Sequence, residues 1–130
     1  MNDFDLCYNI NIELCNFEFK QNSLSYEYLT DAIYIVTKDK STIKDFKTNV
    51  YKPIALKYGT KLQNVQWCLD KLIDMMYLNT STDKINEYFH NYSNPRISTK
   101  RFIIGISRKI SIEGFYEGDI KLRKYDLINS

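Results

Sequence analysis

A small residue followed by a glycine and then by apolar residues constrains the fold of this chain more than any other feature. The residues are Ala55, Gly59 and Val65, within YKPIALKYGTKLQNVQWCLDKL, residues 51–72. In a helix-turn-helix, the small residue lets the two helices touch, and the glycine takes the positive φ of the turn. The apolar residues of the second helix then face inward. The spacing favours this motif over an ordinary pair of antiparallel helices, which is the alternative.

Apolar residues at spacings of three and four predict helices along most of the chain. The residues expected to begin five of them are Ser25, Ser41 or Thr42, Thr60, Ser81 or Thr82, and Ser98. Pro53 lies inside the second of these helices and should bend it or mark an early turn. Residues 6–19 fit a strand and a helix equally well. We expect a single all-α domain over residues 1–130, with about six helices and a short strand in the tail near residues 120–122.

Composition and charge place only broad limits on function. The chain of 130 residues is 44% hydrophobic and 26% charged, as in globular proteins, with a net charge of +2 and a pI near 8.3. This mild basicity permits nucleic-acid binding without indicating it. Three cysteines without metal-ligand spacing are expected to be reduced core thiols. There is no secretory signal and no membrane-spanning run, so we expect a cytoplasmic protein that does not contact a membrane.

The sequence contains no pattern typical of an enzyme or of a cofactor or metal site. His90, the lone histidine, has no neighbouring cysteine or carboxylate pair. The acids Glu113, Glu117 and Asp119 lack the spacing of a calcium loop. Three of the glycines, Gly105, Gly114 and Gly118, do not form a phosphate-binding loop. We therefore expect no enzymatic activity, no cofactor and no metal.

Three blocks of the chain resemble the C-terminal effector domain of the stage zero sporulation protein A family, which holds the master response regulators of sporulation. The blocks are YLTDAIYIV, VYKPIALKYGTKLQNVQWCLDKLIDMMY and STKRFIIGISRKI, and the resemblance covers about residues 10–112. The family has a Tyr-Pro pair where this chain has Tyr51, Lys52 and Pro53. Residues 113–130 form a tail outside the resemblance.

The resemblance implies a six-helix, all-α domain that binds double-stranded DNA through the second helix of the motif. It also implies tandem, head-to-tail copies on repeated sites and contact with RNA polymerase. It favours a helix for the ambiguous residues 6–19. Family proteins carry a phosphorylated receiver domain ahead of this one. The 130 residues have no room for it, so we expect no switching by an aspartyl phosphate of the chain's own.

The outward residues of the second helix depart from the family. The family reads Ser-Arg-Val-Glu-Arg-Ala-Ile-Arg-His where this chain reads Gln-Asn-Val-Gln-Trp-Cys-Leu-Asp-Lys, residues 63–71. Three arginines are lost, and arginine is the usual reader of guanine. Asn64 and Gln66 suit adenine instead, Trp67 suits a thymine methyl group, and Asp70 has the wrong charge for phosphate. We expect either a different, AT-richer site or the loss of base reading.

Two hypotheses follow from this departure. The first is a transcription regulator that binds DNA through Lys61, Gln63, Asn64, Gln66, Trp67 and Lys71. Its expected phosphate contacts are Lys44, Lys47, Lys100, Arg101 and Arg108, which hold register but carry no sequence information. The second is a protein-interaction module that uses the surface around Trp67 to antagonise RNA polymerase or the true sporulation regulator.

Overall fold

The computed structural model describes residues 2–91 and 96–112, and this part of the chain is helical without strands. The elements in chain order are α1 (Asp3–Leu14), α2 (Leu24–Lys38), the 3₁₀ helix η1 (Lys40–Asp45), the π-helix η2 (Lys47–Tyr51), α3 (Lys52–Tyr58), α4 (Leu62–Asn79), α5 (Thr82–Phe89) and a last helix over residues 99–112. The predicted all-α fold of about six helices is confirmed. The strand expected near residues 120–122 lies outside the described residues.

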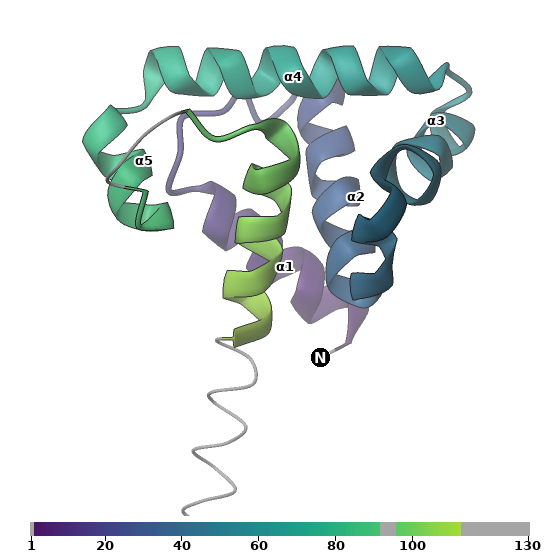
Figure 1. Cartoon of the computed structure of the whole chain (residues 1–130), viewed down its shortest axis with the longest axis horizontal. Coiled ribbons are helices and arrows are strands. Elements are labelled where there is room, and N and C mark those ends of the chain that lie inside the picture. Colours follow the sequence, from purple (N-terminus) through teal and green to yellow (C-terminus); the bar gives the residue numbers. More distant parts are fainter. Residues whose placement is uncertain (1, 92–95, 113–130) are drawn as a thin grey trace, which may run out of the picture.

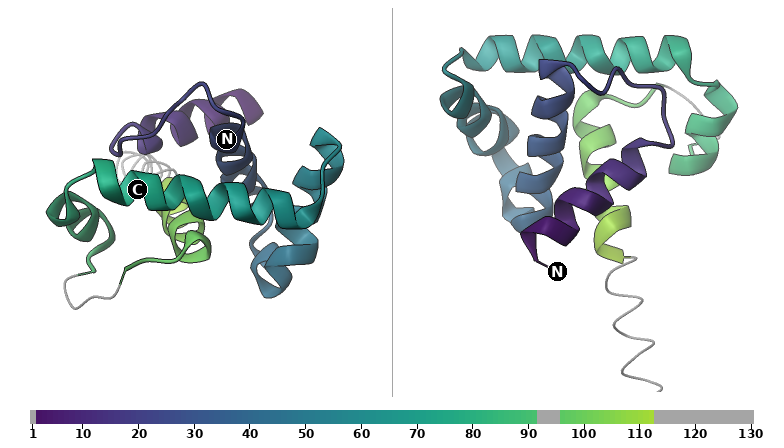
Figure 2. Two further views of the ribbon diagram at one scale, coloured as in Figure 1. Left: turned by 90° about the horizontal axis from the view of Figure 1, so that it is seen from above. Right: turned by 180° about the vertical axis from the view of Figure 1, so that it is seen from behind.

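Helix α4 lies across one end of the molecule, and α2 and the last helix run away from it (Figures 1 and 2). The core fills the space beneath α4. Its most deeply buried side chains include Tyr28, Leu29, Ile33, Val65, Leu69, Met76, Phe102, Ile103 and Ile106. Within the described residues, no helix combines the length and apolar character that a membrane span needs.

Helix α1 settles the ambiguity of the N-terminal segment. Leu6, Ile10 and Leu14, which share one face of a helix, are buried. Tyr8 and Ile12, which a strand would place on that same face, are exposed instead. The side chain of Asn2 caps the helix by accepting a hydrogen bond from the amide of residue 5 at 2.8 Å.

Two of the predicted helix caps are wrong. Helix α2 is capped by Ser23 rather than Ser25, and Oγ of Ser23 accepts the amide hydrogen of residue 26 at 3.2 Å. The helix begins one residue before Ser25, at a leucine that is too exposed to belong to the apolar stripe. Asp39 caps η1 in place of Ser41 or Thr42, and its Oδ1 accepts from the amide of Ser41 at 3.0 Å.

The caps predicted for the last two helices are confirmed. Oγ of Ser81 accepts a hydrogen bond from the amide of Lys84 at 3.2 Å, and α5 follows. Oγ of Ser98 accepts from the amide of Arg101 at 3.2 Å at the start of the last helix. Each serine satisfies an amide that has no partner within the helix itself.

The helical segment before the turn contains one wide turn. In η2, the amide of Lys52 donates to the carbonyl of Lys47, five residues earlier rather than four. Pro53 follows in the first turn of α3, the part of a helix that tolerates proline best. The chain stays helical on both sides of Pro53, so no early turn of the chain occurs there, and the change from π-helical to α-helical geometry lies one residue before it.

Candidate nucleic-acid interface

A left-handed glycine joins α3 to α4, as the sequence predicts. Gly59 has φ 64° and ψ 37°, a conformation that disfavours residues with a Cβ atom. The amide of Thr60 donates to the carbonyl of Ala55 at 2.9 Å, which closes the end of α3. Ala55 is buried where the two helices meet. Helix α4 begins at Leu62 rather than at Thr60, so Lys61 stands at the cap position, just outside the helix.

The two faces of α4 separate as predicted. Val65 and Leu69 are fully buried, and Cys68 is partly buried. The predicted outward residues that are exposed are Lys61, Gln63, Asn64, Trp67, Asp70 and Lys71, while Gln66 is half-buried. The Trp67 side chain remains 60% exposed although it belongs to one of the largest apolar residue types.

Three contacts hold side chains on the outward face of α4 in place. Nζ of Lys71 lies 4.8 Å from the centroid of the Trp67 ring, one helical turn away. Nδ2 of Asn64 donates to Oγ1 of Thr60 at 2.9 Å. Oδ1 of Asn64 accepts a hydrogen bond from the thiol of Cys68 at 3.7 Å. The amide of Asn64 is therefore oriented before any ligand arrives, which lowers the entropic cost of a contact.

The acidic residues of α4 are tied to the segment that begins the last helix. Oδ1 of Asp70 accepts a hydrogen bond from Oγ1 of Thr99 at 2.6 Å. Oδ1 of Asp74 pairs with Nη2 of Arg96, also at 2.6 Å. Asp70 is exposed, as predicted. Its carboxylate also takes part in a contact between two helices, which the sequence does not predict. Arg96 is a cation on this face that the sequence analysis missed.

Three of the predicted phosphate-binding lysines lie close to one another. Lys44 and Lys47 flank Phe46 in the chain, and all three lysines are exposed. Nζ of Lys100 lies 5.6 Å from the centroid of the Phe46 ring, which brings the start of the last helix to this segment. We call Lys44, Lys47 and Lys100, which lie in or beside the segment around Phe46, the basic patch; the exposed acid Asp45 lies between the first two in the chain.

Arg101 and Arg108, the two arginines predicted to bind phosphate, line a groove beside α5. This groove lies between α5 and the last helix and has a volume of about 290 Å³. Arg108 also lines an adjacent groove of about 470 Å³, with Tyr88 and Phe89 of α5. The last helix leads away from α4 (Figure 1). Nine residues separate Arg108 from Thr99, or about 13 Å of helix, so Arg108 is remote from the outward face of α4.

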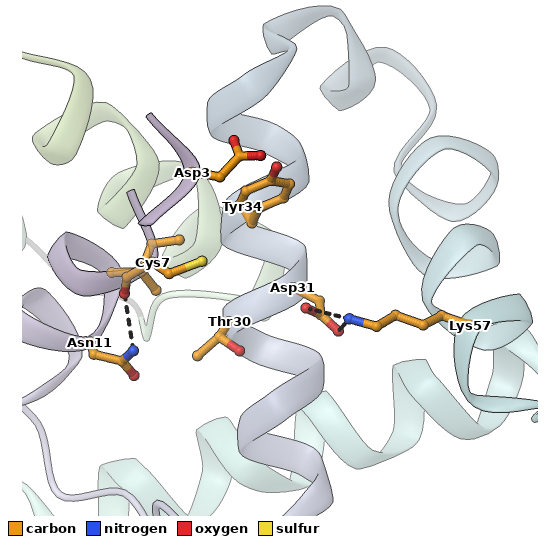
Figure 3. Close-up of a pocket in the computed structure, with 8 residues that line it drawn as sticks. Asp3, Cys7, Asn11, Thr30, Asp31, Tyr34 and Lys57 are labelled. Atoms are coloured by element: carbon orange, nitrogen blue, oxygen red, sulfur yellow. Dashed lines mark hydrogen bonds and ion pairs between the residues drawn. The ribbon is translucent and has the colours of Figure 1, made fainter. Parts of the chain in front are cut away.

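An ion pair between Lys57 and Asp31 joins α3 to α2. Nζ of Lys57 lies 3.1 Å from Oδ2 of Asp31, and the hydroxyl of Tyr58 donates to the same oxygen at 2.7 Å. Burial, followed by the hydrogen bond to Asp31, raises the pKa of Tyr58 to about 12. The same carboxylate raises the pKa of Lys57. Figure 3 shows Asp31 and Lys57 at the edge of a pocket of about 390 Å³. This contact positions the first helix of the motif.

Comparison with known sequences gives one family. The sequence model of the family described as "Sporulation initiation factor Spo0A C terminal" matches residues 12–110. The match agrees with the resemblance expected over about residues 10–112. A comparison with curated proteins gave no match.

Proposed function

This chain belongs to the family of Spo0A C-terminal domains, because the match spans most of its length, and we propose that it is a sporulation regulator that binds double-stranded DNA through α4. The observation that carries the proposal is the outward face of α4, directly after the left-handed turn at Gly59. This face exposes amide, ammonium and indole groups that the core does not use. Insertion of such a helix into the major groove would bring these groups against the base edges.

The amide side chains at the start of α4 suit adenine. An asparagine or glutamine can bind N6 and N7 of adenine with both of its polar atoms. Gln63 and Asn64 are exposed in the first turn of the helix, and the half-buried Gln66 follows. The family's arginines, which suit guanine, are absent here. We therefore propose that this chain recognises a site richer in A·T pairs than the family's own.

Trp67 and the lysines complete the proposed contact. The indole ring can pack against a thymine methyl group or a sugar, and burial of its exposed area would add to affinity. Lys61 and Lys71 flank the amide residues and are exposed, as phosphate contacts require. The patch of Lys44, Lys47 and Lys100 would bind the backbone beside the helix.

A fluorescence-anisotropy titration tests this proposal. The chain is titrated with random duplex DNA and with an AT-rich pool at two salt concentrations. We expect binding that weakens steeply with salt and favours part of the AT-rich pool, whose bound fraction is then sequenced. The Asn64→Ala variant should lose this preference. Asn79→Ala is the matched control, since it makes the same change at the opposite end of α4.

The absence of binding even at low salt would overturn the proposal. The exposed surface around Trp67 would then have to serve a protein partner, and a search for one among transcription proteins would follow. Binding with no preference between the pools would keep DNA as the ligand but remove α4 as a reader of bases.

A further inference from the structure

We propose that Arg96 binds a backbone phosphate of DNA, that Tyr77 holds its guanidinium in place, and that Asp74 competes with the phosphate for it. The proposal rests on the proposed function and adds a phosphate site that the sequence does not suggest. Arg96 precedes the last helix, 22 residues from Asp74 along the chain. Only the fold brings its charge onto the outward side of α4.

The guanidinium of Arg96 is held on two sides. Nη2 donates to Oδ1 of Asp74 at 2.6 Å, and the central carbon lies 4.2 Å from the centroid of the Tyr77 ring. An arginine stacked on an aromatic ring keeps the edge that carries its N–H groups available. The side chain of Arg96 is still 49% exposed and that of Asp74 is 66% exposed, so both groups face solvent.

The backbone beside Arg96 is fixed as well. The hydroxyl of Tyr77 accepts a hydrogen bond from the amide of Ile97 at 2.7 Å. Ile97 is itself buried in the core. One tyrosine therefore positions both the backbone and the side chain at this point. A cation held in this way loses little conformational freedom on binding, and this favours the contact.

The position on α4 suits a phosphate. Asp74 lies seven residues after Trp67, which is two helical turns, so the two residues share one face of α4. A lone carboxylate there would repel the DNA backbone, and the charge of Arg96 neutralises it. A guanidinium has five N–H donors, and the contact with Asp74 is made through one nitrogen atom. The remaining donors have the fork geometry that binds phosphate oxygens in pairs.

Alternatively, the ion pair between Arg96 and Asp74 only stabilises the C-terminal part of α4, as a brace. Exposed ion pairs contribute little to folding, so both single variants should fold. The two roles then differ in the sign of one effect. If Arg96 binds phosphate, Asp74 competes with DNA for it, and removal of Asp74 strengthens binding. If the pair is only a brace, loss of either partner weakens binding alike.

The test is a salt titration of DNA binding with Arg96→Gln, Asp74→Asn and the double variant. We expect Arg96→Gln to lower the slope of log K against log salt by about one and the affinity about eightfold at about 0.1 M salt. Asp74→Asn should raise the affinity, and the double variant should behave like Arg96→Gln. Arg96→Lys should keep the slope, because it keeps the charge. Lys38→Gln is the control, because it removes a charge at the end of α2 that points away from α4, and it should leave the slope unchanged.

The outcomes separate this inference from the proposed function. Wild-type protein that does not bind DNA would overturn both. Wild-type binding with an unchanged slope for Arg96→Gln would overturn the inference alone. A loss of affinity for Asp74→Asn as large as that for Arg96→Gln would also overturn it and would assign the pair to a brace. Thermal melting of each variant shows whether the fold is intact.

Discussion

Oγ1 of Thr99 donates a hydrogen bond to Oδ1 of Asp70 at 2.6 Å, and this contact joins the middle of α4 to the first turn of the last helix. The N-terminal turn of a helix carries partial positive charge from its unpaired amides, so a carboxylate is favourable there. Asp70 also contributes, after burial, to raising the pKa of Tyr51 to about 12. Asp70, a residue of the outward face, thus interacts with the buried residue Tyr51 beneath α4.

The carboxylate of Asp70 is expected to favour folding and to oppose DNA binding. Asp70→Asn keeps an acceptor for Thr99 but removes the charge near the helix N-terminus. We expect a loss of about 0.5 kcal/mol in the free energy of unfolding, measured in urea, and a gain in DNA affinity. Asp70→Ala, which also loses the hydrogen bond, should be less stable than Asp70→Asn by about 1 kcal/mol. Equal stabilities of the two variants would contradict this assignment.

Trp67 is expected to matter for binding and not for stability. Its side chain is 60% exposed, so Trp67→Ala should change the free energy of unfolding by less than about 0.5 kcal/mol. Loss of its contact with DNA should cost about 1.5 to 3 kcal/mol of affinity in an anisotropy titration, as expected for burial of a large apolar side chain. Leu78→Ala is the control on the same helix, since Leu78 is 77% exposed but lies far beyond the residues proposed to read bases. An equal effect of both variants would indicate a nonspecific apolar surface.

Gly105 is expected to resist replacement although it lies within a helix. A Cβ atom there would lie 2.6 Å from Cε1 of Phe89. The ring of Phe89 cannot move aside easily, because it packs against Phe17 and Phe102 with centroids 5.8 Å and 5.3 Å away. Alanine normally stabilises a helix relative to glycine by about 1 kcal/mol. We expect overpacking to outweigh this gain, so that Gly105→Ala lowers stability by about 1 to 3 kcal/mol.

A compensating variant separates overpacking from other causes at this position. Gly105→Ala combined with Phe89→Leu should recover part of the stability that the first change loses, because leucine leaves room for the new methyl group. The measurement is thermal or urea unfolding of the two single variants and the double variant. A more stable Gly105→Ala would show that the ring moves at little cost.

Burial of Tyr58 and its hydrogen bond to Asp31 predict how stability depends on alkaline pH. The pKa of Tyr58 is raised to about 12 in the folded chain, against 10 for an ordinary tyrosine. The unfolded chain therefore loses this proton first, and the resulting stabilisation, complete below pH 10, is lost as pH rises from 10 to 12. Tyr58→Phe should flatten the fall of unfolding free energy across this window. An unchanged pH profile for the variant would place the titration elsewhere.

The fold was largely predictable because its strongest signals are local. The spacing of Ala55, Gly59 and Val65 indicated the turn and the inward face of α4, and the structure has both. Local sequence rules predict less where two nearby residues could each cap the same helix. Ser23 and Ser25 both suit a cap, and only the packing of α2 decides between them. The N-terminal segment was ambiguous because a short apolar run fits two periodicities.

The candidate site was less predictable because its contacts are distant in sequence. The outward residues of α4 follow from helical periodicity and were expected. The partners of its acids are 22 and 29 residues away along the chain, so no local pattern indicates Arg96 or Thr99. The positions of Arg101 and Arg108 likewise depend on the direction of the last helix, which composition does not reveal.

The wide turn of η2 is relevant to a difference of one residue between this chain and the family pattern. The family has adjacent tyrosine and proline where this chain places Lys52 between Tyr51 and Pro53. A π-helical turn holds one residue more than an α-helical turn, and it occurs here directly before Lys52. Such a turn would accommodate the extra residue, and α3 after it is regularly α-helical up to the left-handed residue Gly59.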